Sequence, residues 1–326
     1  MNKTENHNTA CAFLIFEIIL GSILINFPSG KNGIEDIAAT LAASLFAVPF
    51  AALLYKKTVQ NKPLGVSPVK GAFALIICLY FIYACAKNYV GFCDNLMLPF
   101  TPNIVLCALI VVSAFTVSNI KAQALLKLAA AIGVLCLVFY IVVFLWLLSC
   151  AEVSLDFNGF SFKTAAKETV KVFAGSFGTL CILPIIIKGK NISKKGIAAG
   201  VFMGAAALFS AATLVHFSLG AMAANLNAPL YAACGTVKIG EDFTKIDFLC
   251  LFNFFATAFI ELSVLFFAAK EIIFSLFTKK QEAAFTLFCA LAVLFTMLSG
   301  KLSFLDSFYA LAVLFVTEFL FVFIYP

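Results

Sequence analysis

Residues 21–28 read Gly-Ser-Ile-Leu-Ile-Asn-Phe-Pro, and residues 175–184 read Gly-Ser-Phe-Gly-Thr-Leu-Cys-Ile-Leu-Pro. Both segments combine a Gly-Ser pair with a proline a few residues later, within strongly apolar sequence. Glycine has no side chain and proline has no amide hydrogen, so a helix can unwind at such a segment. Unwound backbone at membrane depth is tolerated only where it lines a cavity or is buried in protein. The alternative interpretation is that each Gly-Ser pair lets two helices pack closely.

The sequence around these segments is that of an α-helical membrane protein. Of the 326 residues, 63% are hydrophobic and 12% are charged, and a soluble domain of this size carries more charge on its surface. The apolar runs are long enough to cross the hydrocarbon core as helices and lack the alternation of barrel strands. We expect about ten transmembrane helices, at residues 10–28, 34–55, 69–92, 101–119, 124–150, 170–188, 196–223, 246–277, 283–299 and 303–325.

The predicted spans divide into two halves of five. We expect a cytoplasmic N-terminal tail at residues 1–9 and a single transmembrane domain at residues 10–326, with one repeat at about 10–150 and the other at about 170–326. Because five is odd, the second repeat enters the membrane inverted, as in many secondary transporters. Spans one and six then correspond, and these spans hold the two Gly-Ser segments. The sequence therefore predicts an all-α, five-plus-five inverted-repeat transporter fold with broken helices 1 and 6.

The distribution of lysines predicts the orientation. The formal net charge is +6, and every basic residue other than histidine is a lysine. Cytoplasmic loops of membrane proteins are enriched in such residues, so both termini are expected in the cytoplasm and no nucleic-acid partner is expected. With this orientation the inner loops hold Lys56, Lys57, Lys62, Lys70, Lys121, Lys127, Lys188, Lys190, Lys194, Lys195, Lys279 and Lys280.

Ionisable residues inside predicted spans are candidates for function because they are costly in lipid. Glu17 lies one helical turn before Gly21 and therefore on its face, and Glu261 lies near the middle of span eight. For these two carboxyls we retain two interpretations: a proton or cation coupling site that lines the solute cavity, or a protonated or hydrogen-bonded structural carboxyl between helices. For Glu318 and His216 we favour a structural role.

Sequence motifs of common enzymes are absent. The chain contains no G-x-x-x-x-G-K-[ST] phosphate loop, no H-E-x-x-H motif and no nucleophile elbow. The 11 cysteines form no C-x-x-C pair, and most of them lie in apolar runs where they read as small packing residues. We therefore expect no enzymatic activity, no cofactor and no metal site.

Several motifs resemble those of the spore germination permeases, the membrane-embedded B subunits of nutrient germinant receptors. The Leu-Pro-Phe-Thr-Pro at residues 98–102 is similar to the family's Leu-Pro-x-Thr-Pro, and residues 20–28 resemble its first helix break. Gly33 and Asp36 match a Gly-x-x-Asp before span two, and residues 237–247 resemble the segment leading into span eight, with Lys245 in place of an arginine. The family belongs to the amino acid–polyamine–organocation superfamily of transporters.

The resemblance implies a function as well as a fold. A small nutrient such as an amino acid would bind at the midplane, its carboxylate facing helix N-termini and its ammonium facing freed carbonyls. The implied role is germinant sensing in the inner membrane of the spore, with membrane lipid and the other receptor subunits as partners. The alternative is an ion- or proton-coupled amino-acid transporter not involved in germination. We expect the solute to contact Gly21, Ser22, Ile23, Gly175, Ser176, Phe177 and Gly178, with Phe177 covering its side chain, and coupling to involve Glu17 or Glu261.

Overall fold

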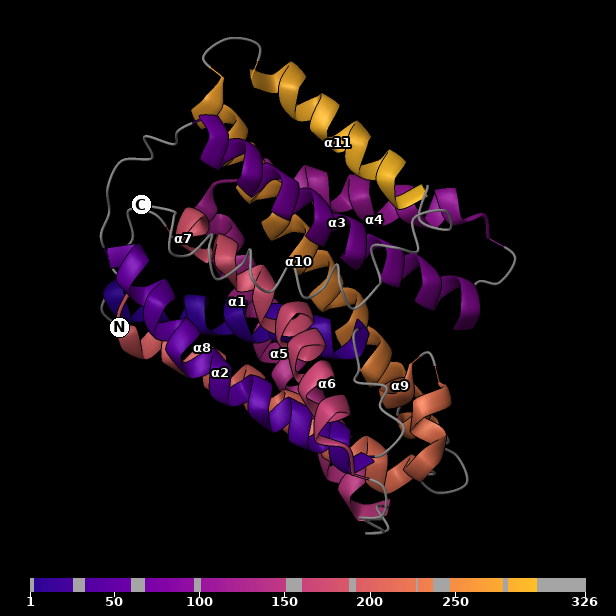
Figure 1. The fold of residues 1–326 in the computed structure, drawn as a ribbon. Coiled ribbons are helices and arrows are strands. Elements are labelled where there is room, and N and C mark those ends of the chain that lie inside the picture. The colour runs from indigo at the N-terminus through magenta and orange to yellow at the C-terminus, as the bar shows by residue number, and fades with distance from the viewer. Residues whose placement is uncertain are drawn as a thin grey trace.

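Helices account for all of the regular secondary structure in the described part of the chain (Figure 1). The computed structural model describes residues 3–25, 33–59, 68–96, 101–150, 160–187, 192–226, 228–236, 247–277 and 281–297. The helices are α1 (Lys3–Ile25), α2 (Gly33–Val59), α3 (Pro68–Leu96), α4 (Asn103–Ser118), α5 (Ala122–Cys150), α6 (Phe162–Phe177), η1 (Gly178–Ile182), α7 (Leu183–Ile186), α8 (Lys194–Leu219), η2 (Gly220–Asn225), α9 (Pro229–Thr236), α10 (Asp247–Leu276) and α11 (Gln281–Met297).

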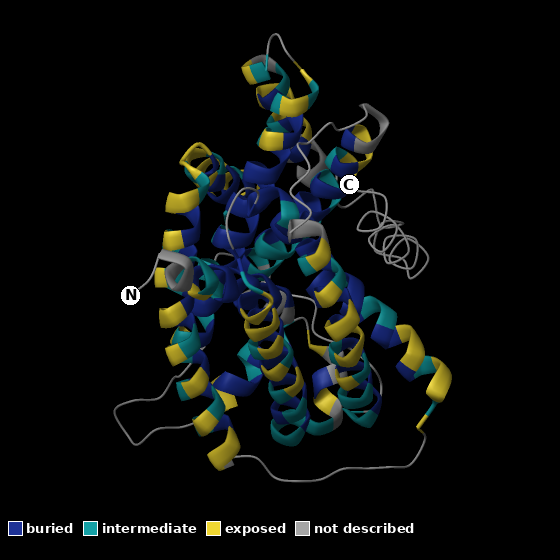
Figure 2. Cartoon of the chain, turned by 90° about the vertical axis from the view of Figure 1, so that its left-hand side faces the viewer, coloured by how far each residue is buried: buried dark blue, intermediate teal, exposed yellow. Residues whose placement is uncertain are grey.

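The helices confirm the class predicted from the sequence. Six helical stretches in the described residues are long and apolar enough to cross a membrane, and α1 and α4 contain shorter apolar segments. Their surfaces also fit lipid, because many large apolar side chains point away from the protein; Leu45, Val48 and Ile76 are each more than 60% exposed. Figure 2 shows exposed and buried residues alternating along the outer helices around a buried centre. The protein is a multi-pass membrane protein; predicted span ten, with Glu318, lies outside the described residues.

The helix pairs follow the exchange expected of an inverted repeat. An inverted repeat exchanges spans one to five with spans six to ten. The contact between spans one and seven, α1 and α8, then corresponds to the contact between spans six and two, α6–η1–α7 and α2. Both contacts are present. The same exchange relates α3–α4 to α10–α11 and α4–α10 to α11–α3, which also pack together. Helices α3 and α10 exchange with one another and contact each other. These pairs agree with an inverted repeat, whereas the contact of α1 with α10 has no counterpart of similar extent between the sixth span and α3 among the described residues.

The first helix begins earlier than the sequence predicts. It starts at Lys3, so residues that were expected in an N-terminal tail form its first turns. Asn8 Oδ1 accepts a hydrogen bond from the backbone N of Ser193, at 2.7 Å, just before α8 begins. A Cβ atom added to Gly196 would lie 3.1 Å from the Asn8 backbone. These contacts pack the start of α1 against α8, which hydropathy alone does not reveal.

The sixth span also begins earlier, at Phe162 rather than at residue 170. Ser161 caps this helix: its Oγ accepts a hydrogen bond from Thr164 N at 3.4 Å, and its own N donates to Glu35 Oε1 at 2.7 Å. The first turns of α6 carry Lys163, Lys167 and Glu168. The mean hydropathy of this amphipathic first part is low, so the sequence places the start of the span too late, although the Ser161 cap makes these residues helical.

The two Gly-Ser segments behave differently in the structure. After Phe177 the sixth helix changes from α-helix to the 3-10 segment η1 and then continues as α7, so the predicted break in this span is present. In contrast, α1 remains helical through Gly21 and Ser22 as far as Ile25, and Pro28 lies outside the described residues. The unwinding expected at Gly21 and Ser22 themselves is therefore not observed. Ser22 Oγ donates to Ile18 O at 2.9 Å within the same helix.

Candidate solute and coupling site

The carboxyl group of Glu261 on α10 lies in the buried centre of the bundle, beside Gly21 and Thr179. Thr179 of η1 donates its hydroxyl to Glu261 Oε1 at 3.0 Å. Cys85 of α3 lies on the other oxygen, with its Sγ 3.8 Å from Glu261 Oε2. All three side chains are buried. The carboxyl group thus joins three helices that are far apart in the sequence, and no cation pairs with it among the described residues.

Helix α1 approaches the same carboxyl through Gly21. A Cβ atom added there would lie 3.2 Å from Thr257 Cβ and 3.3 Å from Glu261 Oε2. Such distances are shorter than ordinary van der Waals contacts, so the missing side chain is what lets α1 approach α10. Gly21 therefore fits the close-packing interpretation of its Gly-Ser pair. Gly21 also places the segment 21–28 beside the Glu261 carboxyl group. Thr179, which follows Gly178 in the segment 175–184, contacts the same carboxyl group.

Helix α10 presents a polar stripe at this centre. Asn253, Thr257 and Glu261 follow one another at intervals of four residues, so they share one face of the helix. All three are buried. Thr257 donates its hydroxyl to Asn253 O at 2.6 Å, whereas the side-chain oxygen of Asn253 has no hydrogen-bonding partner among the described residues. A buried polar atom without a partner calls for an explanation such as a water or a ligand.

Glu17 is the second buried carboxyl of the centre. It is fully buried on α1, and neither of its carboxylate oxygens has a hydrogen-bonding partner among the described residues. It lies one turn before Gly21 on the same face of α1. No hydrogen bond between the described helices holds Glu17, so a protonated structural carboxyl and a coupling site remain its two interpretations.

The remaining predicted solute contacts cluster where α6 ends. Ser176 is buried and its hydroxyl has no partner among the described residues. Phe177 is fully buried, and its ring lies 5.5 Å from that of Phe173, centroid to centroid. Gly175 belongs to the last turn of α6. Ile23 is helical in α1, and its side chain lies outside the described set.

A second buried polar pair lies away from this centre. His216 Nε2 of α8 is 2.9 Å from Asp36 Oδ2 of α2, and both side chains are buried. A Cβ atom on Gly33 would lie 2.8 Å from the His216 ring, so this position accommodates only glycine unless the ring moves. The pair supports the structural role expected of His216 and explains the Gly-x-x-Asp motif physically: glycine makes room for the ring that the aspartate binds.

Sequence reasoning missed four residues of the centre. Thr257 and Asn253 could have been found, because a polar stripe at intervals of four residues within an apolar span indicates a buried polar face. Thr179 follows Gly178 directly, but nothing in its sequence context points to Glu261. Cys85 carries no signal at all in a chain with so many apolar cysteines.

Comparison with known proteins identifies the family of this chain. The sequence profile described as spore germination protein matches residues 9–305. The chain belongs to the spore germination protein family. This agrees with the resemblance drawn from the motifs. None of the curated proteins matches the sequence.

Solved structures show the fold of this spore germination family member. A Na⁺-coupled sialic acid symporter in a substrate-bound outward-open state is similar with a TM-score of 0.60 and 12% identity, over 94% of this chain and 75% of the symporter. A manganese transporter from Eremococcus coleocola is similar with a TM-score of 0.54 and 13% identity, over 97% of this chain and 76% of the transporter. At such identities the likeness establishes the transporter fold and not a shared solute.

Proposed function

We propose that this protein binds a small nutrient, an amino acid, between α1 and the broken sixth span and takes part in germinant sensing. The observation that carries the proposal is the convergence on Glu261, where α1, α3, η1 and α10 meet. In a transporter fold the solute site lies near the midplane at the interface of the two repeats, beside discontinuous helices. The break at Gly178 is such a discontinuity.

The contacts of Glu261 suggest how binding would be signalled. Thr179 belongs to η1 of the sixth span, which contacts α1, whereas Cys85 and Glu261 belong to α3 and α10, which pack against one another. The hydrogen bond between Thr179 and Glu261 therefore joins the broken sixth span to the pair α3–α10, and we expect this junction to shift when a solute binds. A solute that inserts between them must exchange this bond for its own contacts, and the resulting change in packing is what partner subunits would detect.

The polar atoms beside the break offer the contacts that an amino acid needs. Ser176 Oγ is buried and has no partner among the described residues, and the change from α-helix to η1 alters which backbone groups are hydrogen-bonded. An ammonium group would be attracted to Glu261, since the described residues pair it with no cation. Phe177 provides an apolar surface once its packing against Phe173 opens.

A coupled transporter is the second candidate function, and the two buried carboxyls favour it. An ionised carboxylate without a partner is costly in a membrane interior. Glu17 and Glu261 are therefore suited to take up a proton or a cation when water reaches them and to release it when the site closes. The similarity of the fold to that of a Na⁺-coupled symporter agrees with this candidate.

Thermal shift of the purified protein in detergent tests the proposal with the 20 proteinogenic amino acids, each at millimolar concentration, as probes. We expect one or a few of them to raise the midpoint of unfolding, and Ser176→Ala to reduce that effect while Thr40→Ala, in the buried wall of α2, retains it. Stabilisation by none of the amino acids would refute the proposed ligand class. Uptake of the stabilising amino acid into proteoliposomes distinguishes the functions, because accumulation driven by a proton or sodium gradient would favour the coupled transporter.

A further inference from the structure

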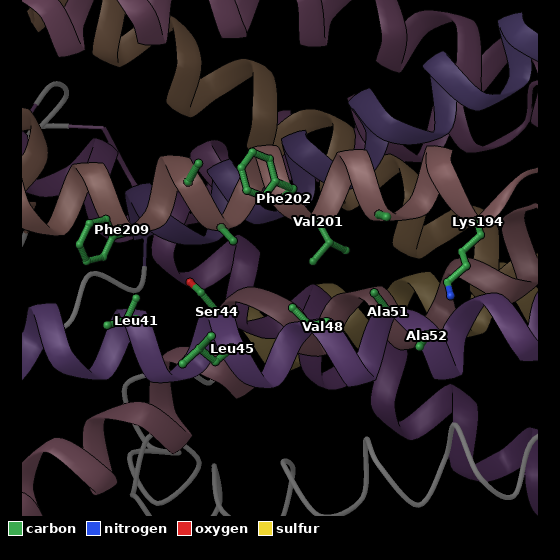
Figure 3. A pocket seen from close by; sticks show the side chains of 13 residues that line it. Leu41, Ser44, Leu45, Val48, Ala51, Ala52, Lys194, Val201, Phe202 and Phe209 are labelled. Atoms are coloured by element: carbon green, nitrogen blue, oxygen red, sulfur yellow. The ribbon is translucent and has the colours of Figure 1, made fainter.

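An apolar groove runs along the outer surface of the bundle between α2 and α8 (Figure 3). It has a volume of about 590 Å³ and is lined on one side by α2 from Leu41 to Ala52 and on the other by α8 from Lys194 to Phe209. Alanines make up much of the lining, and side chains such as Val48 and Phe202 are mostly exposed. The groove is a surface feature that belongs to neither the solute centre nor the His216 pair.

The groove carries charge at one end only. Lys194 is its single charged lining residue, and Figure 3 shows the lysine nitrogen pointing from α8 across the groove toward α2. Ser44 is the only other lining residue with a polar side chain, and its hydroxyl is bonded within α2 to Thr40 O at 2.7 Å. The walls are therefore apolar from Lys194 to the far end. Lys56 of α2 and Lys195 of α8 are exposed near the same end.

We propose that this groove binds an anionic phospholipid, with an acyl chain along α2 and α8 and the phosphate of the headgroup at Lys194. The length agrees: from Leu41 to Ala52 the helix rises by about 17 Å at 1.5 Å per residue, which is close to one leaflet of a hydrocarbon core of about 30 Å. The charge agrees as well, because basic pockets between transmembrane helices at the cytoplasmic side attract acidic headgroups. The orientation predicted from the lysines assigns this end to the cytoplasmic leaflet.

The pattern of charge favours a lipid over a protein helix. A second apolar helix seated in the groove would offer Lys194 only the partial negative charge of a helix C-terminus, which is smaller than the full charge of a phosphate. A phospholipid has one acidic group above an apolar chain, which is the order of groups that the groove presents. None of the lining residues is acidic, so no repulsion opposes a phosphate.

Neighbouring residues on α8 supply matched controls. Lys194 and Ala198 line the groove, whereas Lys195 and Ala199 are exposed on the same helix but do not line it. The test compares phosphatidylglycerol with phosphatidylcholine of identical acyl chains, added to the delipidated full-length protein in detergent. Native mass spectrometry measures bound lipid, and the midpoint of thermal unfolding measures stabilisation.

We expect tighter binding of phosphatidylglycerol, weakened about fivefold by Lys194→Gln and less than twofold by Lys195→Gln. Ala198→Phe, which fills the groove, is expected to abolish this binding, whereas Ala199→Phe retains it. Equal binding of the two lipids, or equal losses for the two lysine variants, would overturn the proposal. So would a dimer in lipid-free detergent that Ala198→Phe dissociates, since a second copy would then occupy the groove. Destabilisation of the lipid-free monomer by Ala198→Phe and not by Ala199→Phe would also overturn it, because a segment of the protein's own chain would then fill the groove.

Discussion

The hydrogen bond from Thr179 to Glu261 is expected to hold the centre of the bundle closed. Thr179→Val keeps the shape of the side chain and removes the donor to Glu261 Oε1, which lies 3.0 Å away. Hydrogen bonds between transmembrane helices contribute about 0.6 kcal/mol on average and about 1.7 kcal/mol at most. A buried acceptor left without its donor costs about 1–3 kcal/mol. We therefore expect Thr179→Val to lower the free energy of unfolding by about 1–2 kcal/mol.

A double-mutant cycle isolates this bond from other effects of the substitution. The assay is unfolding in mixed detergent micelles with increasing sodium dodecyl sulfate, measured for Thr179→Val, Glu261→Met and the double variant. In the Glu261→Met background, Thr179→Val should be almost neutral because the acceptor is gone. Thr40→Val is the matched control: Thr40 is also buried, but among the described residues its hydroxyl donates only to Ile37 O within α2, so its loss should cost less than about 0.5 kcal/mol. Equal costs of Thr179→Val with and without the carboxyl would show that the two side chains do not interact.

Three further substitutions test other contacts. Gly21→Ala places a methyl group 3.2 Å from Thr257 Cβ; we expect a loss of about 1–3 kcal/mol in the same unfolding assay, and an unchanged midpoint would contradict the close approach of α1 to α10. Asp36→Ala removes the carboxyl group that lies 2.9 Å from His216 Nε2, so about 1–3 kcal/mol should be lost; an unchanged free energy of unfolding would mean that the pair is not needed for folding. Asn8→Ala removes the acceptor for Ser193 N, and a reduction of about 0.5–1.5 kcal/mol is expected; hydrogen exchange at the start of α8 should rise with it, and unaltered exchange would argue against this hydrogen bond.

The groove and the solute centre can be tested separately because they share no residues. Filling the groove at Ala198 should leave amino-acid binding in place, and Ser176→Ala should leave phosphatidylglycerol binding in place. Loss of both activities in one correctly folded variant would indicate that the groove and the centre are coupled.

Hydropathy and composition determined the class of this protein and the positions of most of its helices. Crossing a bilayer is a local requirement, since each span must satisfy its own backbone hydrogen bonds and present apolar side chains along its own length. For this reason the predicted ends of spans two to five and seven to nine agree with the described helices to within a few residues. The change of helix type at Gly178 is only partly local, because the similar pair Gly21-Ser22 remains α-helical in α1.

Partners across the bundle were decided only by the tertiary structure. The bond from Thr179 to Glu261 joins residues 82 positions apart, and the contact between His216 and Asp36 joins residues 180 positions apart. No local pattern encodes such pairs, because each depends on which faces of two helices meet. Packing also decided the interpretation of Gly21. Its sequence allowed either an unwound helix or a close approach between two helices, and the short distances to Thr257 and Glu261 on α10 show the close approach.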